Sequence, residues 1–304
     1  MRILLWLANP VRAFEPTSEQ LAALRARVSH ELVAAPSESE FLAQLPAADA
    51  VVVWRFLPEW YARAPRLRHS FTPSAGHDPL PADPTRRVER HFGSFQGLLM
   101  AESLVAMITF LNCRLGAALQ GQAARRWDRA PFSERRRLHG QVALIIGYGA
   151  IGQHCGRLLS ALGMVVHGLR RDVTRPSPWV QRMFSPAERL EALALADHVI
   201  CVLPGDTGTD HFLDATALGR MKPSSCLYNL GRGNAIDIIA LGDALTRGRI
   251  AGAFLDVTPE EPLPASSGLW TLPNLYLSPH ASAIGAEYLD LYFEQLAGEL
   301  EHLS

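Results

Sequence analysis

The segment GYGAIG at residues 147–152 constrains the fold of this chain most, because of the sequence on either side of it. It follows an apolar run at 142–146 that predicts a buried strand, and it opens a helical pattern that continues to Leu162. A strand, a glycine turn and a helix in this order form a dinucleotide-binding unit, in which the helix N-terminus faces the phosphates. The residues predicted to line the dinucleotide are Gly147, Gly149, Ala150, Ile151 and Gly152.

The next strand, predicted at 164–169, bears on which dinucleotide is bound. NAD-specific folds place an acidic residue near the end of this strand for the ribose hydroxyls, whereas this chain has Arg170 and Arg171 there. A guanidinium can hold a 2′-phosphate through paired, charge-assisted hydrogen bonds, and a carboxylate would repel it. NADP(H) is therefore favoured. NAD(H) is the alternative, if Asp172 serves the ribose and the arginines form only a solvated surface.

Length, charge and cysteine content narrow the class of protein. A chain of 304 residues exceeds what one hydrophobic core usually organises, which predicts two domains. The net charge of −1 gives no electrostatic reason to expect nucleic acid or a membrane as a partner, so small molecules are favoured. Four cysteines without CxxC spacing predict reduced thiols and a cytoplasmic location. No metal site is expected.

Predicted strands alternate with helices along the chain, which indicates an α/β fold with a doubly wound parallel sheet. Strands are expected at 3–7 and 50–54, and a second series begins at 142 and continues near Val165, Val199, Cys226 and Ala253. A long irregular segment lies at 72–91. One long helix is expected at 98–119 and a final helix at 284–303.

Open α/β sheets bind ligands at the carboxyl ends of their strands, and three loops there carry reactive side chains. Arg232 lies between two glycines in NLGRG, Glu261 ends an acidic loop that begins at Asp256, and His280 lies in SPHAS. Taken singly, these could be a surface arginine in a turn, a proline-stiffened acidic loop and one of 11 histidines. The order and spacing of the three loops, taken together, indicate a family far more specifically than any one loop does.

Together the loops resemble the D-isomer-specific 2-hydroxyacid dehydrogenases, particularly glyoxylate and hydroxypyruvate reductases. The resemblance spans nearly the whole chain and is carried by GYGAIG, Leu203-Pro204 with Thr209, NLGRG, LDVTPEEPLP and SPHAS. It implies a Rossmann-type domain at 104–279 that binds NAD(P). It also implies a smaller flavodoxin-like α/β domain that binds substrate, built from both termini at 1–103 and 280–304.

The resemblance assigns roles to individual residues. Arg232 would bind the substrate carboxylate and polarise its carbonyl, while Glu261 would pair with His280, the general acid and base. The chemistry agrees, because hydride addition to a 2-keto acid leaves negative charge on an oxygen that must be stabilised and protonated. A carboxylate beside an imidazole also favours its protonated form. Asp256 matches the position that orients the nicotinamide carboxamide. The other implied cofactor-lining residues are Leu203, Pro204, Thr209 and Leu230.

Substrate-binding candidates lie in the N-terminal part of the chain. The family folds a loop in the segment corresponding to 72–91 whose backbone N–H groups hold the substrate carboxylate, and Ala75 and Gly76 match it. Trp54 and Arg55 resemble positions that face the cleft in glyoxylate reductases, although Arg55 could equally be an exposed strand end. The expected substrates are small 2-keto acids such as glyoxylate and hydroxypyruvate, with D-2-hydroxy acids as products.

The resemblance also implies a homodimer, joined through the long helix and the cofactor domain. Two other interpretations share the fold. A formate dehydrogenase-like enzyme would carry glutamine where this chain has Glu261, and a nucleotide-sensing, corepressor-like scaffold could keep the same reactive residues.

Overall fold

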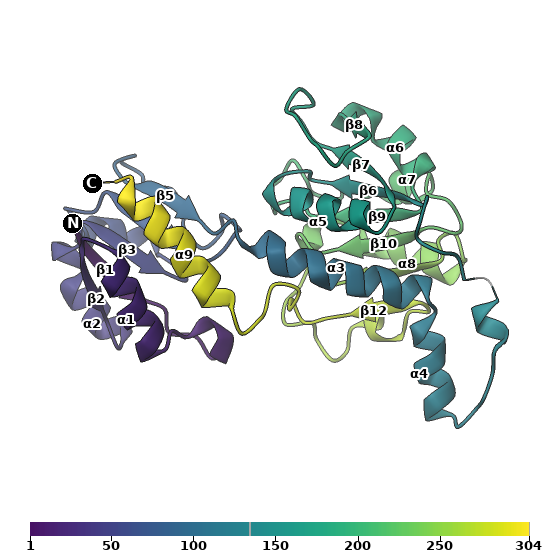
Figure 1. The fold of residues 1–304 in the computed structure, drawn as a ribbon, viewed down its shortest axis with the longest axis horizontal. Coiled ribbons are helices and arrows are strands. Elements are labelled where there is room, and N and C mark those ends of the chain that lie inside the picture. The colour runs from purple at the N-terminus through teal and green to yellow at the C-terminus, as the bar shows by residue number, and fades with distance from the viewer. Residues whose placement is uncertain (134, 304) are drawn as a thin grey trace. The chain divides into compact units, whose positions relative to one another are not determined.

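The computed structural model describes residues 1–133 and 135–303, and the chain forms two compact units (Figure 1). Unit 1 comprises Met1–Gln96 and Ile284–Ser304, and unit 2 comprises Gly97–Ala283. The chain therefore leaves unit 1 once and returns to it near the C-terminus. The expected boundaries at 103/104 and 279/280 lie within helix α3 (Gln96–Asn112) and just after strand β12 (Leu275–Leu277).

Unit 1 is built on a five-stranded parallel sheet in the order β2-β1-β3-β4-β5. This order is the flavodoxin-like one, as the sequence predicts. The central strands are apolar because both faces are covered, and the register partners Leu4 and Val51 are fully buried. The strands are β1 (Arg2–Trp6), β2 (Glu31–Ala34), β3 (Ala50–Val53), β4 (His69–Thr72) and β5 (Glu89–Phe92).

Three α-helices belong to the described part of unit 1. Helix α1 begins at a capping box, in which Thr17 and Gln20 satisfy each other's backbone N–H groups. The C-terminal helix buries an apolar stripe that includes Tyr292 and Leu296, and this stripe holds the end of the chain to unit 1. The helices are α1 (Ser18–Arg27), α2 (Glu38–Gln44) and α9 (Tyr288–Glu301).

Unit 2 contains a seven-stranded parallel sheet in the order β12-β11-β10-β9-β6-β7-β8. This is the Rossmann order with one added strand, and the direction of winding reverses between β6 and β9. The predicted doubly wound sheet is therefore confirmed. The other strands are β6 (Val142–Ile146), β7 (Val165–Leu169), β8 (Arg182–Phe184), β9 (His198–Cys201), β10 (Cys226–Asn229) and β11 (Gly252–Leu255).

Helices pack on both faces of this sheet, and two apolar clusters form its core. Strands β9 and β10 are buried along their whole length, which explains their nearly continuous apolar sequence. Ser185 and Glu188 form the predicted capping box ahead of α6. The remaining helices are α4 (Leu115–Ala123), α5 (Ala150–Ala161), α6 (Arg189–Leu195), α7 (Ala215–Leu218) and α8 (Ile238–Thr246).

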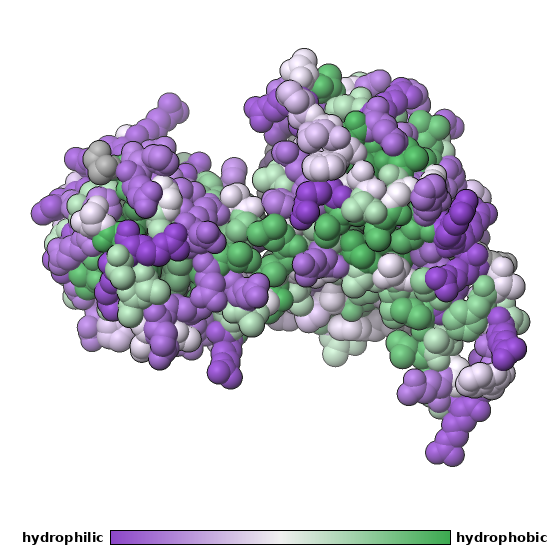
Figure 2. All heavy atoms as spheres, viewed as in Figure 1, coloured by the Kyte–Doolittle hydropathy of each residue, from purple (hydrophilic) through white to green (hydrophobic). Residues whose placement is uncertain are grey.

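The expected single helix at 98–119 is wrong. The structure has two helices, α3 and α4, bent by 66° at the break between them. Arg114 adopts a left-handed conformation, with φ of 57°, which an α-helix cannot accommodate. Hydropathy did not reveal the break, because both segments are apolar. Figure 2 shows hydrophobic residues gathered over these helices.

Other boundaries also differ from expectation. The final helix begins at Tyr288 rather than at 284, and β5 shortens the irregular segment expected at 72–91. Strands β2, β4, β5 and β8 were not predicted, since each has only three or four residues and lies at or beside a sheet edge. In the described part of the chain, no single helix is long and apolar enough to span a membrane, although the bent α3–α4 pair together meets that test by length and composition.

Asp197 joins the starts of several elements of unit 2. Its carboxylate accepts hydrogen bonds from the backbone N–H of Val142 at 2.9 Å and from Lys222 Nζ at 2.8 Å. Burial acts to raise the pKa of this carboxyl, but the hydrogen bonds from Lys222 and Val142 outweigh it and lower the pKa below the usual 3.8. The lowered pKa means that the charged carboxylate stabilises the fold above pH 3.8, and that this contribution is lost as the pH falls through the lower value.

We therefore expect Asp197→Asn to destabilise unit 2 by about 1–3 kcal/mol at pH 7, because charge-assisted hydrogen bonds are lost. The difference from wild type should shrink as the pH is lowered below 4, which calorimetric melting at several pH values measures. Asp243→Asn is the control, because the pair that Asp243 forms with Arg247 is exposed to solvent. Equal effects of the two substitutions, or a difference independent of pH, would contradict this assignment.

Candidate active site

The three glycines of residues 147–152 have three different surroundings. Gly147 has a φ of 92°, and a Cβ there would lie 2.8 Å from the backbone oxygen of Val202. At Gly152 a Cβ would lie 3.0 Å from Gly147 O, so this glycine lets α5 pack closely on the turn. A Cβ at Gly149 would meet nothing nearer than 4.0 Å, and the residue is exposed. The turn, the close packing and the open approach are those that a pyrophosphate site needs.

The start of helix α5 is available to an anion. No side chain of the described residues caps it, and Gly149 and Ala150 are exposed while Ile151 packs partly against the core. The first N–H groups of a helix have no partner within the helix, and they carry its partial positive charge. The predicted dinucleotide residues therefore expose backbone N–H groups in the arrangement that phosphate binding requires.

The two arginines at the end of β7 differ in burial and in hydrogen bonding. Arg170 is half-buried and donates to the backbone oxygen of Arg175, whereas Arg171 is exposed. The carboxylate of Asp172 accepts hydrogen bonds from Thr174 and pairs with Arg175 Nε at 3.0 Å, and the Thr174 hydrogen bonds lower its pKa. Asp172 is thus held within its own turn, and Arg171 is the more accessible of the predicted phosphate-binding residues.

The loops after β9 and β10 lie against each other. Thr209 Oγ1 donates to Pro204 O at 2.7 Å and closes the first loop. Leu230 is buried and its N–H donates to Cys201 O at 2.9 Å. A Cβ at Gly231 would lie 2.4 Å from the backbone oxygen of Leu203, so only glycine permits this approach. The predicted cofactor-lining residues Leu203, Pro204, Thr209 and Leu230 are thereby brought together.

The side chain of Asn229 fixes the backbone of the turn that carries Arg232. The side chain of Asn229 accepts a hydrogen bond from Gly231 N–H at 3.1 Å and donates to Arg232 O at 3.0 Å. Sequence reasoning did not single out Asn229, although asparagine side chains commonly form hydrogen bonds with the backbone of the turn that follows them. A Cβ at Gly233 would lie 2.1 Å from the carbonyl carbon of Thr258, so the arginine turn packs directly on the acidic loop.

Glu261 and His280 meet in this structure. Glu261 Oε2 lies 2.8 Å from His280 Nδ1, and Thr258 N–H donates to Glu261 Oε1 at 3.0 Å. Both carboxylate oxygens are therefore used, and the side chains are 38% and 48% exposed. A carboxylate accepts hydrogen from Nδ1, so Nε2 of the imidazole is directed away from the pair.

Asp256 holds the loop that carries His280. Its carboxylate is buried and accepts hydrogen bonds from Ser278 Oγ, Ala281 N–H and Ser282 N–H at 2.5, 2.8 and 3.0 Å. Its backbone oxygen accepts a fourth from His280 N–H at 2.8 Å. A buried charge requires such partners. The family resemblance implies a role for Asp256 at the nicotinamide, and the structure shows that Asp256 fixes the loop of His280.

Four of the substrate-binding candidates lie in unit 1, whereas Arg232 lies in unit 2. Trp54 is half-buried, packs against Phe14 and Tyr288, and donates from Nε1 to Phe14 O at 3.1 Å, while Arg55 is exposed. In the 72–91 loop, Gly76 N–H already donates to Ser74 Oγ at 3.2 Å. The base of this loop is anchored at Pro73 O by Gln96 Nε2 and Tyr288 OH. Ala75, half-buried beside Gly76, is the other candidate.

Residues 105–282 match the family described as D-isomer specific 2-hydroxyacid dehydrogenase, NAD binding domain. Glyoxylate/hydroxypyruvate reductase B of Pectobacterium carotovorum is 29% identical over 257 residues, which cover 81% of this chain and 77% of that protein. The chain spans only 60% and 52% of the length of two other curated relatives that it matches.

Solved structures agree with the fold. A D-isomer specific 2-hydroxyacid dehydrogenase family protein from Aeromonas salmonicida is 29% identical, with a TM-score of 0.81 and coverage of 99% of this chain and 94% of that one. An NADPH-dependent glyoxylate/hydroxypyruvate reductase from Sinorhizobium meliloti, in complex with NADP and sulfate, is 24% identical, with a TM-score of 0.79 and coverage of 99% and 94%. This chain belongs to the D-isomer specific 2-hydroxyacid dehydrogenase family.

Proposed function

We propose that this protein reduces a small 2-keto acid to the D-2-hydroxy acid with NAD(P)H. The observation that carries the proposal is the Glu261–His280 pair, held by Thr258 beside the turn of Arg232, in the unit that also contains the glycine loop. The formate dehydrogenase-like alternative is not favoured, because it would place an amide at residue 261. The scaffold alternative predicts no turnover.

The proposed mechanism uses three side chains. A bound nicotinamide would supply hydride to the keto carbon, and the carbonyl bond's electron pair would move to its oxygen. His280 then donates a proton from Nε2 to that oxygen, while Glu261 keeps the imidazole oriented through Nδ1. Arg232 stabilises the developing negative charge and the substrate carboxylate, which a guanidinium can engage through two N–H groups. In the opposite direction neutral His280 accepts the hydroxyl proton.

We propose NADP(H) as the preferred cofactor, with NAD(H) as the alternative. Arg171 is exposed at the end of β7, and Asp172 is already paired with Arg175, so a cation is better placed than a carboxylate to meet a 2′-phosphate. The named specificity of the Sinorhizobium reductase for NADPH supports this choice.

For the substrate, we propose glyoxylate, hydroxypyruvate or a related 2-keto acid, in line with the name of the Pectobacterium relative. Ala75 is a stronger candidate than Gly76 for holding the substrate carboxylate through its backbone N–H, because Gly76 N–H donates to Ser74. Arg55 is exposed and remains a candidate carboxylate ligand, whereas Trp54 is engaged with Phe14 and Tyr288.

We also propose that two copies of the chain associate through α3 and α4. The side chains of Leu115 and Leu119 are 43% and 58% exposed, and Trp127, just beyond α4, is 90% exposed. Apolar groups gathered on one surface are typical of an interface between proteins. The same helices show hydrophobic residues in Figure 2.

Replacing His280 by Asn should lower kcat for hydroxypyruvate reduction by about 10²–10⁴-fold, because the proton donor is lost. The Kd for NADPH, measured by fluorescence titration, should stay nearly unchanged. His139→Asn is the control, since His139 is an exposed histidine of the same unit. A near-normal kcat in His280→Asn would contradict the assignment of His280 as the proton donor.

Glu261→Gln should lower kcat by at least about tenfold with little change in KM, because Glu261 positions the imidazole that exchanges the proton. Glutamine has one carbonyl oxygen, whereas Thr258 N–H and His280 Nδ1 each use one oxygen of Glu261. Steady-state kinetics at saturating cofactor measure the effect. The matched control is Glu260→Gln, which should behave as wild type, and a similar fall in both variants would count against the pair.

Arg171→Ser should reduce kcat/KM for NADPH by about 10–100-fold, since it removes a charge-assisted hydrogen bond to the 2′-phosphate. The value for NADH should change little, because NADH lacks that phosphate. Arg247→Ser, another exposed arginine of unit 2, is the control. Equal losses with both cofactors, or faster turnover of wild type with NADH than with NADPH, would refute the phosphate contact.

A further inference from the structure

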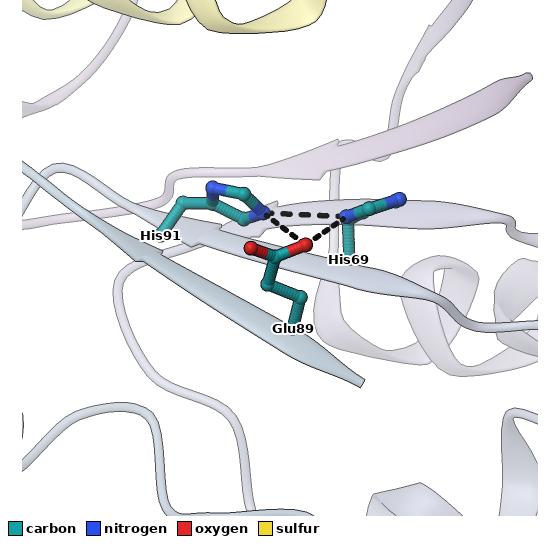
Figure 3. Close-up of side chains that lie close together, drawn as sticks. All are labelled: His69, Glu89 and His91. Carbon is teal, nitrogen blue, oxygen red and sulfur yellow. Dashed lines mark hydrogen bonds and ion pairs between the residues drawn. The ribbon is translucent and has the colours of Figure 1, made fainter. Parts of the chain in front are cut away.

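Three side chains converge on one face of the unit 1 sheet (Figure 3). His69 lies on β4, and Glu89 and His91 lie on the neighbouring edge strand β5. The register pairs His69 with Glu89 and Phe71 with His91. Residues two apart on a strand point to the same face, so the pairing of these two strands brings all three side chains together.

The three ligand atoms form a small triangle. His69 Nδ1 lies 3.2 Å from His91 Nε2 and 3.6 Å from Glu89 Oε2, and His91 Nε2 lies 4.0 Å from the same carboxylate oxygen. A point equidistant from these three atoms is about 2.1 Å from each, which is the usual length of Zn–N and Zn–O bonds. The atoms therefore need to move by only tenths of an ångström to bind one ion.

A hydrogen bond between the imidazoles accounts for only part of this arrangement. One proton can lie between the two facing nitrogens, and the oxygen of Glu89 then adds a third set of lone pairs directed at the same region. Glu299 Oε2 from α9 lies 4.0 Å from the other nitrogen of His91, Nδ1. A carboxylate there favours a proton on Nδ1 and leaves Nε2 free to bind a metal, as is common around zinc.

The surroundings suit a site that an ion can enter. The imidazole ring of His91 is stacked on Phe71, with centroids 4.3 Å apart and an interplanar angle of 15°, which fixes its orientation. Both histidine side chains are 17% exposed, whereas Glu89 is 66% exposed. Glu89 can thus adjust its position, and the fourth coordination position can be filled by water.

We propose that His69, Glu89 and His91 bind a divalent transition-metal ion, best matched by Zn²⁺, with water as a fourth ligand. Among the described residues, this is the one group of three or more that fits such an ion. The ion would link edge strand β5 to β4 through its ligands and would thereby stabilise the folded state of unit 1. The sequence predicted no metal site, because the pairing that unites residues 20 and 22 positions apart is visible only in the sheet.

The test is Zn²⁺ titration of the full chain, produced without a histidine tag and cleared of metal with a chelator that is then removed. Calorimetric titration should show one ion per chain. Saturating Zn²⁺ should raise the melting temperature by at least about 5 °C, as ligand linkage to a small folded unit predicts.

Glu89→Gln should weaken Zn²⁺ binding by at least about tenfold, comparable with the loss of an important group around a metal. Its side chain is exposed, so the fold should persist, and the melting temperature without metal checks this. His91→Gln should abolish saturable binding. His302→Gln, an exposed histidine of the same unit, and His280→Asn, from the candidate active site, should bind Zn²⁺ as wild type does.

Two results would overturn the proposal. One is the absence of saturable Zn²⁺ binding to the wild-type chain. The other is binding that survives unchanged in Glu89→Gln and His91→Gln but is lost in His280→Asn, which would place the ion at the Glu261–His280 pair instead.

Discussion

The buried carboxylate of Asp256 is the group on which the candidate active site depends. It accepts hydrogen bonds from Ser278, Ala281 and Ser282, and its backbone holds His280, so one residue fixes the whole histidine loop. Leaving such a charge buried without these partners would be strongly unfavourable, and the loop is therefore constrained to one arrangement. That arrangement places the imidazole against Glu261 and leaves its other nitrogen for chemistry.

The parallel sheet of unit 2 explains why residues distant in the sequence meet. Each reactive loop follows the carboxyl end of a strand, and adjacent strands place those ends along one edge. The loops are then joined by approaches that only glycine allows, between Gly231 and Leu203 and between Gly233 and Thr258. Backbone packing, rather than long side chains, therefore sets the geometry of these loops and the position of Arg232.

Much of this was predictable from the sequence, because glycine turns and apolar strand patterns have direct local causes. The doubly wound parallel sheet, the glycine loop and the three reactive loops follow from such signals, whereas the order of the strands comes from the structure. The break at Arg114 did not, since a left-handed residue between two apolar segments leaves no mark in hydropathy. The positioning role of Asp256 and the convergence of His69 with His91 also depend on tertiary pairing, which a single sequence does not display.

The most direct test of the proposed reduction is the chirality of the product formed from hydroxypyruvate, measured together with the amount of NADPH or NADH consumed. The proposed mechanism predicts D-glycerate, with one cofactor molecule oxidised for each product molecule. Formation of L-glycerate would contradict the proposed arrangement of hydride and proton donors. Failure to oxidise either cofactor with hydroxypyruvate, glyoxylate or bulkier 2-keto acids, by a chain that still binds the dinucleotide, would contradict the enzymatic function itself.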